Sequence, residues 1–265
     1  MSWIAWLLVS CLTVIGCSAK PFSDSSVISA DEGEAIALTV SAAASMQDTL
    51  NAIQPVYQTV YPDNTLVYNF ASSGSLQQQI EQGAPVDVFL SASPKQVNAL
   101  EEKGLLLQGT RRDLVKNTIV LITLLDTSNV MTFDDLSKDA VTKLSIGEPE
   151  SVPAGQYSKE VLESLELYDA IQSKTVFAKD VRQVLSYVET GNVDAGLVYS
   201  TDANSSDQVQ IVATAPEDTH SPIVYPGAVI IDSQHPDAAT EFVKFLETDE
   251  AIAIFTDYGF LPASE

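Results

Sequence analysis

Three short apolar runs in the sequence each lead into a Ser or Asp that is followed, three residues later, by an acid or an amide. The pairs are Ser45 with Asp48, Ser75 with Gln78, and Asp180 with Gln183. This spacing is typical of a helix N-cap. The first N–H groups of a helix lack partners within the helix and carry partial positive charge, so these junctions are candidate anion sites. Capping alone would explain any one of them.

A fourth junction has the residues Val152-Pro153-Ala154-Gly155 and is predicted to open a helix at Tyr157. Its small residues would let a ligand approach the backbone closely. Such junctions lie at the carboxyl ends of parallel strands, where ligands of open α/β sheets bind. Two sheet edges that face each other across a cleft would bring several helix N-termini to one anion.

The elements that must position these junctions follow from the hydrophobic pattern, in which short apolar runs alternate with helical periodicity. Strands are predicted at 38–42, 66–70 and 86–90 in a first series, and at 143–147, 175–177 and 195–199 in a second. Helices are predicted at 46–60, 75–82 and 94–103, and then at 157–167 and 181–190. This alternation predicts an α/β protein with mostly parallel sheets flanked by helices.

Two lobes are predicted from the order of these series. A strand at 117–123 has no helix directly after it, and we expect it to carry the chain into the second lobe. The strands and helices after residue 208 are expected to return the chain to the first lobe. Lobe 1 would then hold residues 35–116 and 222–265, and lobe 2 would hold residues 117–221.

Composition limits the class of protein. The chain has 265 residues, of which 45% are hydrophobic and 18% charged, enough apolar material for packed cores in one or two domains. It has 13 Lys and Arg against 36 Asp and Glu, so its formal net charge is −23. Nucleic-acid binding is disfavoured, because contacts to a phosphate backbone need clustered Lys and Arg. A solvated acidic surface suits a soluble exported protein.

The N-terminal segment resembles an export signal. Residues 3–16 are mostly apolar but shorter than the roughly 20 residues that a membrane-spanning helix needs, so residues 1–17 are predicted to be a signal peptide. Its end, Val14-Ile15-Gly16-Cys17-Ser18, resembles the lipobox of bacterial lipoproteins, in which the cysteine becomes lipid-modified. A plain secretory signal is the alternative, since residues 1–8 hold no Lys or Arg. Residues 18–34, rich in Ser and acids, are predicted to be a flexible tether.

Residue types that would support catalysis are scarce. The sequence has no Gly-x-Ser-x-Gly elbow, and its two histidines, His220 and His235, lie near proline in predicted loops. Both cysteines, Cys11 and Cys17, belong to the N-terminal segment, so the folded body has no cysteine for a disulfide or a metal. We therefore expect a protein that is not an enzyme and carries no cofactor.

Longer motifs cover most of the body. In the first part they are Ala42-Ala43-Ala44-Ser45, Phe70-Ala71-Ser72-Ser73-Gly74-Ser75-Leu76 and residues 79–92; in the second they are residues 147–149, 152–160, 180–182 and 196–203. From Ala42 onward the sequence resembles the periplasmic molybdate-binding proteins on these motifs. The resemblance implies the type II periplasmic-binding-protein fold, with two α/β lobes and the ligand in the cleft between them.

The resemblance also implies a set of ligand-binding residues. Ser45 and Ser73 would offer hydroxyl and backbone N–H donors from lobe 1, and Ala154 and Val181 would offer backbone N–H groups from lobe 2. The Tyr199 hydroxyl would complete the set. Every donor is neutral, which suits a fully ionised oxyanion, because a protonated oxyanion would also need an acceptor.

Arg182 follows Val181 in the same motif and could be taken for the charge partner of the anion. An arginine in the first turn of a helix more often faces solvent or pairs with a carboxylate. We therefore predict that Arg182 lies outside the ligand-binding set.

The implied function is an extracytoplasmic receptor that binds molybdate or tungstate through its oxygens and delivers it to the permease of an ABC importer. The receptor would be a monomer in the periplasm or at the cell surface, with no nucleic-acid partner and held to a membrane only by lipid at Cys17. A receptor for sulfate, phosphate or a small organic acid is the main alternative, and a purely structural lipoprotein is the third. Molybdate and tungstate have nearly the same size and charge, so the sequence does not separate them.

Overall fold

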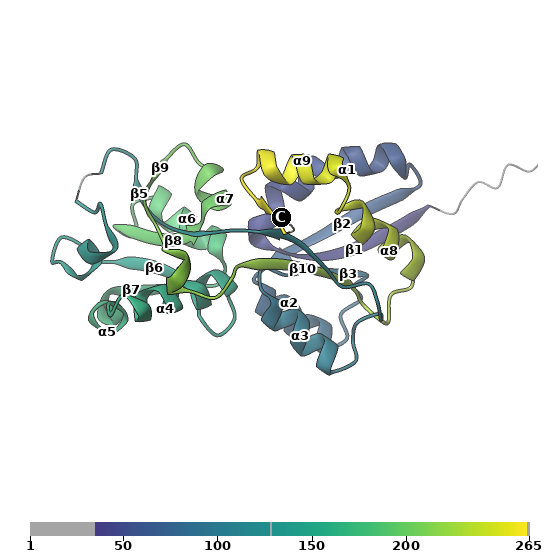
Figure 1. The fold of residues 1–265 in the computed structure, drawn as a ribbon, viewed down its shortest axis with the longest axis horizontal. Coiled ribbons are helices and arrows are strands. Elements are labelled where there is room, and N and C mark those ends of the chain that lie inside the picture. The colour runs from purple at the N-terminus through teal and green to yellow at the C-terminus, as the bar shows by residue number, and fades with distance from the viewer. Residues whose placement is uncertain (1–34, 128, 264–265) are drawn as a thin grey trace, which may run out of the picture. The chain divides into compact units, whose positions relative to one another are not determined.

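The structure of the chain is a computed structural model that describes residues 35–127 and 129–263 (Figure 1). The predicted signal peptide, the lipid site at Cys17 and the tether at 18–34 lie outside the described residues. Among the described residues, no helix combines the length and the apolar character that crossing a membrane requires.

Two sheets organise the chain. The first has the strand order β11-β4-β10-β3-β1-β2 and the second β7-β6-β8-β5-β9. The first sheet consists of β1 (Ile36–Ala43), β2 (Asn64–Ala71), β3 (Val88–Leu90), β4 (Arg112–Lys116), β10 (Val224–Val229) and β11 (Leu261–Pro262). The second consists of β5 (Ile119–Leu124), β6 (Leu144–Gly147), β7 (Thr175–Ala178), β8 (Ala195–Tyr199) and β9 (Val209–Thr214). We call each sheet with its helices a lobe, the first being lobe 1.

Helices flank both sheets (Figure 1). Lobe 1 has α1 (Gln47–Val60), α2 (Ser73–Glu81), α3 (Pro94–Glu102), α8 (Pro236–Phe245) and α9 (Asp249–Asp257). Lobe 2 has α4 (Pro153–Ser164), α5 (Tyr168–Ile171), α6 (Val181–Glu189) and α7 (Ser200–Asn204). The α/β architecture with two flanked sheets is thus as predicted, and β4, β11, α5 and α7 are additions to the predicted elements.

The sheets are mixed, which corrects the prediction that each is mostly parallel. Among the described residues, four of the nine strand pairings are parallel and five are antiparallel. Four of the five antiparallel pairings involve β10 in lobe 1 or β5 in lobe 2, and the fifth joins β11 to β4. Strands β10 and β5 follow the segments that connect the lobes rather than a crossover helix, and only a crossover keeps successive strands parallel.

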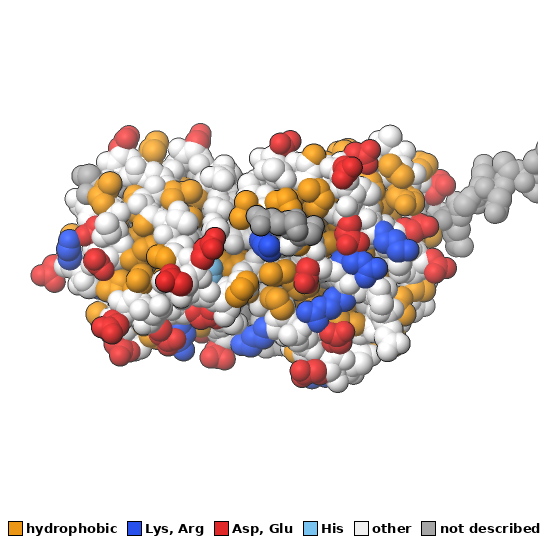
Figure 2. Space-filling model, in the orientation of Figure 1, with side chains coloured by type: hydrophobic (Ala, Val, Ile, Leu, Met, Phe, Trp, Pro, Cys, Tyr) orange, Lys and Arg blue, Asp and Glu red, His pale blue; other side chains and the backbone are white. Residues whose placement is uncertain are grey.

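Apolar periodicity explains why the helices pack where they do. In α6 the side chains of Val181, Val184, Leu185 and Val188 are all buried, a spacing that places them on one helical face. That face packs against β8 and β6. This packing places the start of α6 at the ends of these strands. Many acidic side chains lie at the surface and are spread over both lobes on the face that Figure 2 shows, whereas Asp87 and Asp202 are buried.

Candidate functional site

One small cavity lies at the carboxyl ends of strands from both sheets. The free space at its centre is about 10 Å³. It is lined by Ala43, Ala44, Ser45, Ala71, Ser72, Ser73, Ala92, Val152, Pro153, Ala154, Asp180, Val181 and Tyr199. Sites for drug-sized ligands typically measure about 300–1,000 Å³, so this cavity fits a single small ion better than a larger organic molecule.

The structure brings all five predicted ligand residues together in this cavity. Ser45 and Ser73 line it from lobe 1, whereas Ala154, Val181 and Tyr199 line it from lobe 2. All five are buried. They follow or end five different strands and belong to sequence motifs that are up to 154 positions apart, from 45 to 199.

Three helices begin at the cavity, with the N–H groups of their first turns directed to their N-terminal ends. Ser73 is the first residue of α2, Val181 is the first residue of α6, and Ala154 is the second residue of α4. The N-cap of α4 is Val152, whose apolar side chain cannot accept a hydrogen bond, and Pro153 has no N–H to satisfy. Each terminus therefore offers positive partial charge to an anion in the cavity.

Two of the predicted caps are wrong, and each error bears on the site. The N-cap of α2 is Ser72, not Ser75, because Ser72 has the extended backbone of a cap and its Oγ accepts a hydrogen bond from the Ser75 N–H at 3.3 Å. Ser45 lies in a 3-10 turn, η1 (Ala44–Met46), that precedes α1. Its hydroxyl therefore lines the cavity instead of capping the helix.

The third predicted cap is confirmed, whereas the fourth junction is shifted. Asp180 is the N-cap of α6 and its Oδ1 accepts from the Gln183 N–H at 2.8 Å. Helix α4 begins at Pro153 rather than at Tyr157. Proline is favoured at the first position of a helix, which explains the earlier start.

The hydrogen-bond partners of the Ser45 and Ser73 hydroxyls leave each hydroxyl able to donate its proton to a ligand. Ser73 Oγ accepts a hydrogen bond from the Ala92 N–H at 3.0 Å, which leaves its own proton for a ligand. Ser45 Oγ lies 3.0 Å from the Tyr225 hydroxyl, which in turn accepts from the Asn117 side-chain amide at 3.3 Å. With that amide donating to Tyr225, the phenol can donate to Ser45 and the serine proton can face the cavity.

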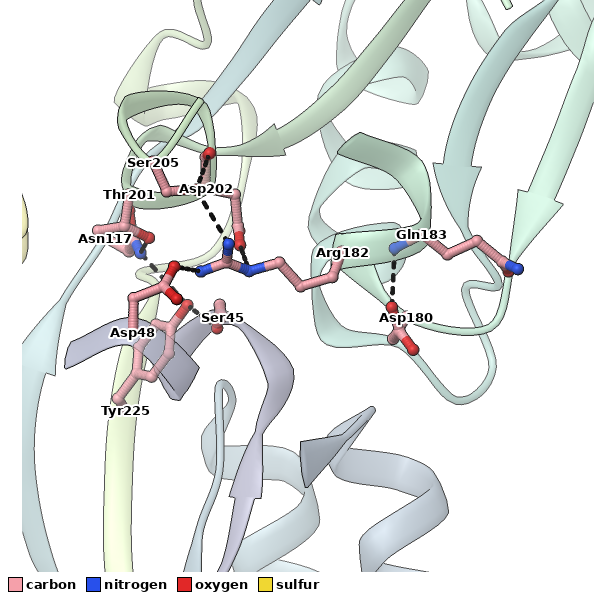
Figure 3. A network of polar contacts seen from close by, with 10 residues as sticks. All are labelled: Ser45, Asp48, Asn117, Asp180, Arg182, Gln183, Thr201, Asp202, Ser205 and Tyr225. Carbon is pink, nitrogen blue, oxygen red and sulfur yellow. Dashed lines mark hydrogen bonds and ion pairs between the residues drawn. The ribbon is translucent and has the colours of Figure 1, made fainter. Parts of the chain in front are cut away.

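Burial keeps the phenols neutral. It raises the pKa of Tyr199 and that of Tyr225 well above the usual value, so both remain hydroxyl donors at neutral pH. The Tyr199 hydroxyl lies 3.5 Å from the Ala92 carbonyl oxygen, a long contact that a better acceptor could replace. Among the residues that line the cavity, the ionisable acid is Asp180, whose carboxylate is turned to the Gln183 N–H (Figure 3). An anion bound here would meet neutral donors.

Metal-type ligation is not supported. Within residues 35–127 and 129–263, no three His, Cys, Asp or Glu side chains lie close enough together to hold a metal ion. The two histidines lie outside the lining of the cavity.

Arg182 pairs with carboxylates, as predicted (Figure 3). Its Nη2 lies 2.6 Å from Asp48 Oδ2, and its Nε lies 2.8 Å from Asp202 Oδ1. The sequence reasoning missed both acids, and it missed Tyr225 and Asn117 behind Ser45. These partners lie between 20 and 180 positions apart, and no local spacing could have indicated them.

The pKa of the buried Asp202 carboxyl group predicts how the stability of the folded protein depends on pH. Burial raises its pKa from an ordinary 3.8 to about 7, and Arg182 opposes this only in part. Between pH 3.8 and about pH 7 the folded protein therefore holds a proton on Asp202 that the unfolded chain has lost. The stability that this proton contributes is present at low pH and is lost as the pH rises through 7. In Asp202→Asn this loss should be absent. The melting temperature of the variant relative to wild type should therefore rise between about pH 5 and about pH 8. A difference that does not change with pH would show that Asp202 does not titrate in this range.

Comparisons with known proteins agree with this site and fold. A family model described as bacterial extracellular solute-binding protein matches residues 38–261. YvgL of Bacillus subtilis (strain 168), which carries the provisional name of an ABC transporter substrate-binding lipoprotein, is 46% identical over 96% of this chain and 95% of its own.

Two molybdate-binding proteins are also similar. The molybdate-binding protein ModA of Haemophilus influenzae is 41% identical over 84% of this chain and 89% of its own. The solved structure of the periplasmic molybdate-binding protein of Azotobacter vinelandii aligns with a TM-score of 0.78 at 25% identity, over 84% of this chain and 98% of that chain. The likeness to this structure confirms the predicted periplasmic-binding-protein fold. With the family model matching most of its length, the chain belongs to the bacterial extracellular solute-binding proteins.

Proposed function

We propose that the chain captures molybdate or tungstate outside the cytoplasm and delivers it to an ABC importer. The observation that carries this proposal is the small cavity at which three helix N-termini and three neutral hydroxyl groups meet. The names of the relatives point to the same ligand and the same kind of transporter.

The donor set favours a tetrahedral dianion. The backbone N–H groups of Ser73, Ala154 and Val181 come from three different helices, so they can approach different oxygens of one ion. Hydrogen bonds to an ionised acceptor are roughly twice as strong as those between neutral groups. An ion that is fully deprotonated at neutral pH can accept from all of these donors at once.

Phosphate and sulfate are the competing ligands. Hydrogen phosphate would bring a proton that needs an acceptor, whereas the hydroxyl and backbone N–H groups assigned to the ligand serve as donors. Sulfate is also fully ionised, and it differs from molybdate mainly in its shorter bonds. We expect the spacing of donors across the two lobes to favour the larger ion.

Binding without chemical change is the expected role of the site. The Ser45 hydroxyl is hydrogen-bonded to the Tyr225 phenol, and the Ser73 hydroxyl to the Ala92 N–H. Neither partner is a histidine that could take the serine proton. We further propose that the chain works as a monomer with an ABC permease. Export through residues 1–17 and lipid attachment at Cys17 complete the proposal, and the lipoprotein name of YvgL supports them.

Thermal melting of the purified protein with each oxyanion tests the proposal. A ligand at about a hundred times its dissociation constant should stabilise the folded state by roughly 2.7 kcal/mol. We expect molybdate and tungstate to raise the melting temperature, and sulfate and phosphate to raise it less at equal concentration. Sodium chloride at matched ionic strength is the control. A larger shift with sulfate or phosphate, or no shift with any of the four, would contradict the proposed ligand.

A further inference from the structure

Three charged residues stand next to predicted ligand residues in the sequence and meet in space. Asp48 lies three positions after Ser45, Arg182 directly follows Val181, and Asp202 lies three positions after Tyr199. We call Asp48, Arg182 and Asp202 the charge triad. Figure 3 shows the Arg182 side chain between the two carboxylates, close to Ser45.

We propose that Arg182 is a positioning residue for ligand binding, which holds the two lobes in the closed arrangement by pairing with Asp48. This inference rests on the proposed function and goes beyond it. Arg182 is not among the residues that line the cavity. It would act through the segments that carry Ser45, Val181 and Tyr199.

The guanidinium group is bound on both sides of the cleft. In lobe 2, its Nε lies 2.8 Å from Asp202 Oδ1 and its Nη1 donates to Ser205 Oγ at 2.9 Å. Its Nη2 donates to Asp48 Oδ2 at 2.6 Å, and Asp48 belongs to α1 in lobe 1. The planar, forked shape of the group allows these contacts to form together.

Lobe 2 alone is able to hold Arg182 ready for this contact. Asp202 is completely buried and Ser205 is fixed by its own hydrogen bond to the Asp202 carbonyl oxygen at 2.7 Å. Because these partners already restrict the Arg182 side chain, pairing with Asp48 costs less conformational entropy than a bridge between two free side chains. The Arg182 side chain is 25% exposed and that of Asp48 is 40% exposed, so solvent weakens the pair without abolishing it.

Opening of the cleft would separate Arg182 from Asp48 but leave Arg182 with Asp202. The Asp48 contact therefore stabilises the closed form and should slow ligand release, with little effect on capture. The triad also explains why an arginine beside the cavity does not serve as the ligand's charge partner. Its guanidinium group is already engaged by Asp48 and Asp202.

The test is the release rate of radiolabelled molybdate from the full chain, chased with unlabelled molybdate. In Asp48→Asn we expect release to be roughly fivefold faster, with a nearly unchanged association rate, as for loss of a partly exposed ion pair in the closed state. Asp48 is partly exposed, so the melting temperature of the ligand-free variant should stay close to that of wild type. Arg182→Lys, which keeps the charge but loses the fork, should also release faster.

Electrostatics alone predict the opposite direction, which makes the test decisive. Removing a negative charge close to an anion should tighten binding and slow release. Asp257→Asn is the matched control, because Asp257 is an exposed acid of the same surface groove as Asp48. We expect the control to release molybdate no faster than wild type.

The possible failures are distinguishable. Unchanged or slower release in Asp48→Asn, with normal binding by wild type, would overturn the role of Arg182 and leave the proposed function standing. Equally fast release in Asp257→Asn would also overturn it, since the effect would then not depend on the pair with Arg182. If wild type binds no oxyanion, the proposed function and this inference both fall.

Discussion

Replacing Gly74 by alanine is expected to weaken molybdate binding by between about fivefold and about 150-fold, the cost of roughly 1–3 kcal/mol that overpacking typically brings. Gly74 lies in the first turn of α2 in lobe 1, and its N–H donates to the Ser151 carbonyl oxygen in lobe 2 at 3.0 Å. A Cβ atom at position 74 would lie 2.5 Å from that oxygen and 2.8 Å from Ser151 Cα. Backbone atoms cannot yield as a flexible side chain can, so the lobes should fail to close fully.

Calorimetric titration checks this prediction together with the melting of the ligand-free protein. Alanine is favoured over glycine within a helix by about 1 kcal/mol, so lobe 1 should not be destabilised by the change. Gln78→Ala, at an exposed position of the same helix, is the control and should bind normally. Full affinity in Gly74→Ala would show that ligand binding does not need the contact between α2 and Ser151.

Tyr199→Phe and Ser45→Ala should each weaken binding by roughly tenfold to a hundredfold, because each removes one hydrogen bond to a charged group, worth about 1.5–3 kcal/mol. Both hydroxyls line the cavity and are buried. Calorimetry gives the affinities, and circular dichroism should show that both variants remain folded. Tyr187→Phe, in α6 but outside the cavity lining, is the matched control. Unchanged affinity in both test variants would mean that the assigned site is wrong.

Local pattern was sufficient for most of the fold. The strands at the centre of lobe 2 are short β-branched or apolar runs, such as Ala195 to Tyr199, and α6 has an apolar face at helical spacing. Strand β4 has the residues Arg-Asp-Leu-Val-Lys, three of the five charged, and gives no clear alternation. It is a strand because β10 and β11 pair with it on either side, which no local pattern reveals.

The local sequence pattern predicted the site less completely than it predicted the fold. Capping chemistry located the junctions but chose the wrong serine in α2, because Ser72 and Ser75 are both good caps and differ only in backbone conformation. The five ligand residues came from a resemblance and not from spacing. The groups that support them depend on contacts between elements that are far apart in the sequence. Tyr225 reaches Ser45 from β10, and Arg182 reaches Asp48 from α6, so only the folded chain reveals them.

The most direct test of the central claim is the anomalous scattering of tungsten in crystals grown with tungstate. The heavy atom marks the ligand without any assumption about the protein around it. We predict one dominant peak in the cavity, with the oxygens of the ion within hydrogen-bonding distance of the hydroxyl groups of Ser45, Ser73 and Tyr199 and of the N–H groups of Ala154 and Val181. A peak at another place, or one in direct contact with the Arg182 guanidinium, would contradict a site built from neutral donors.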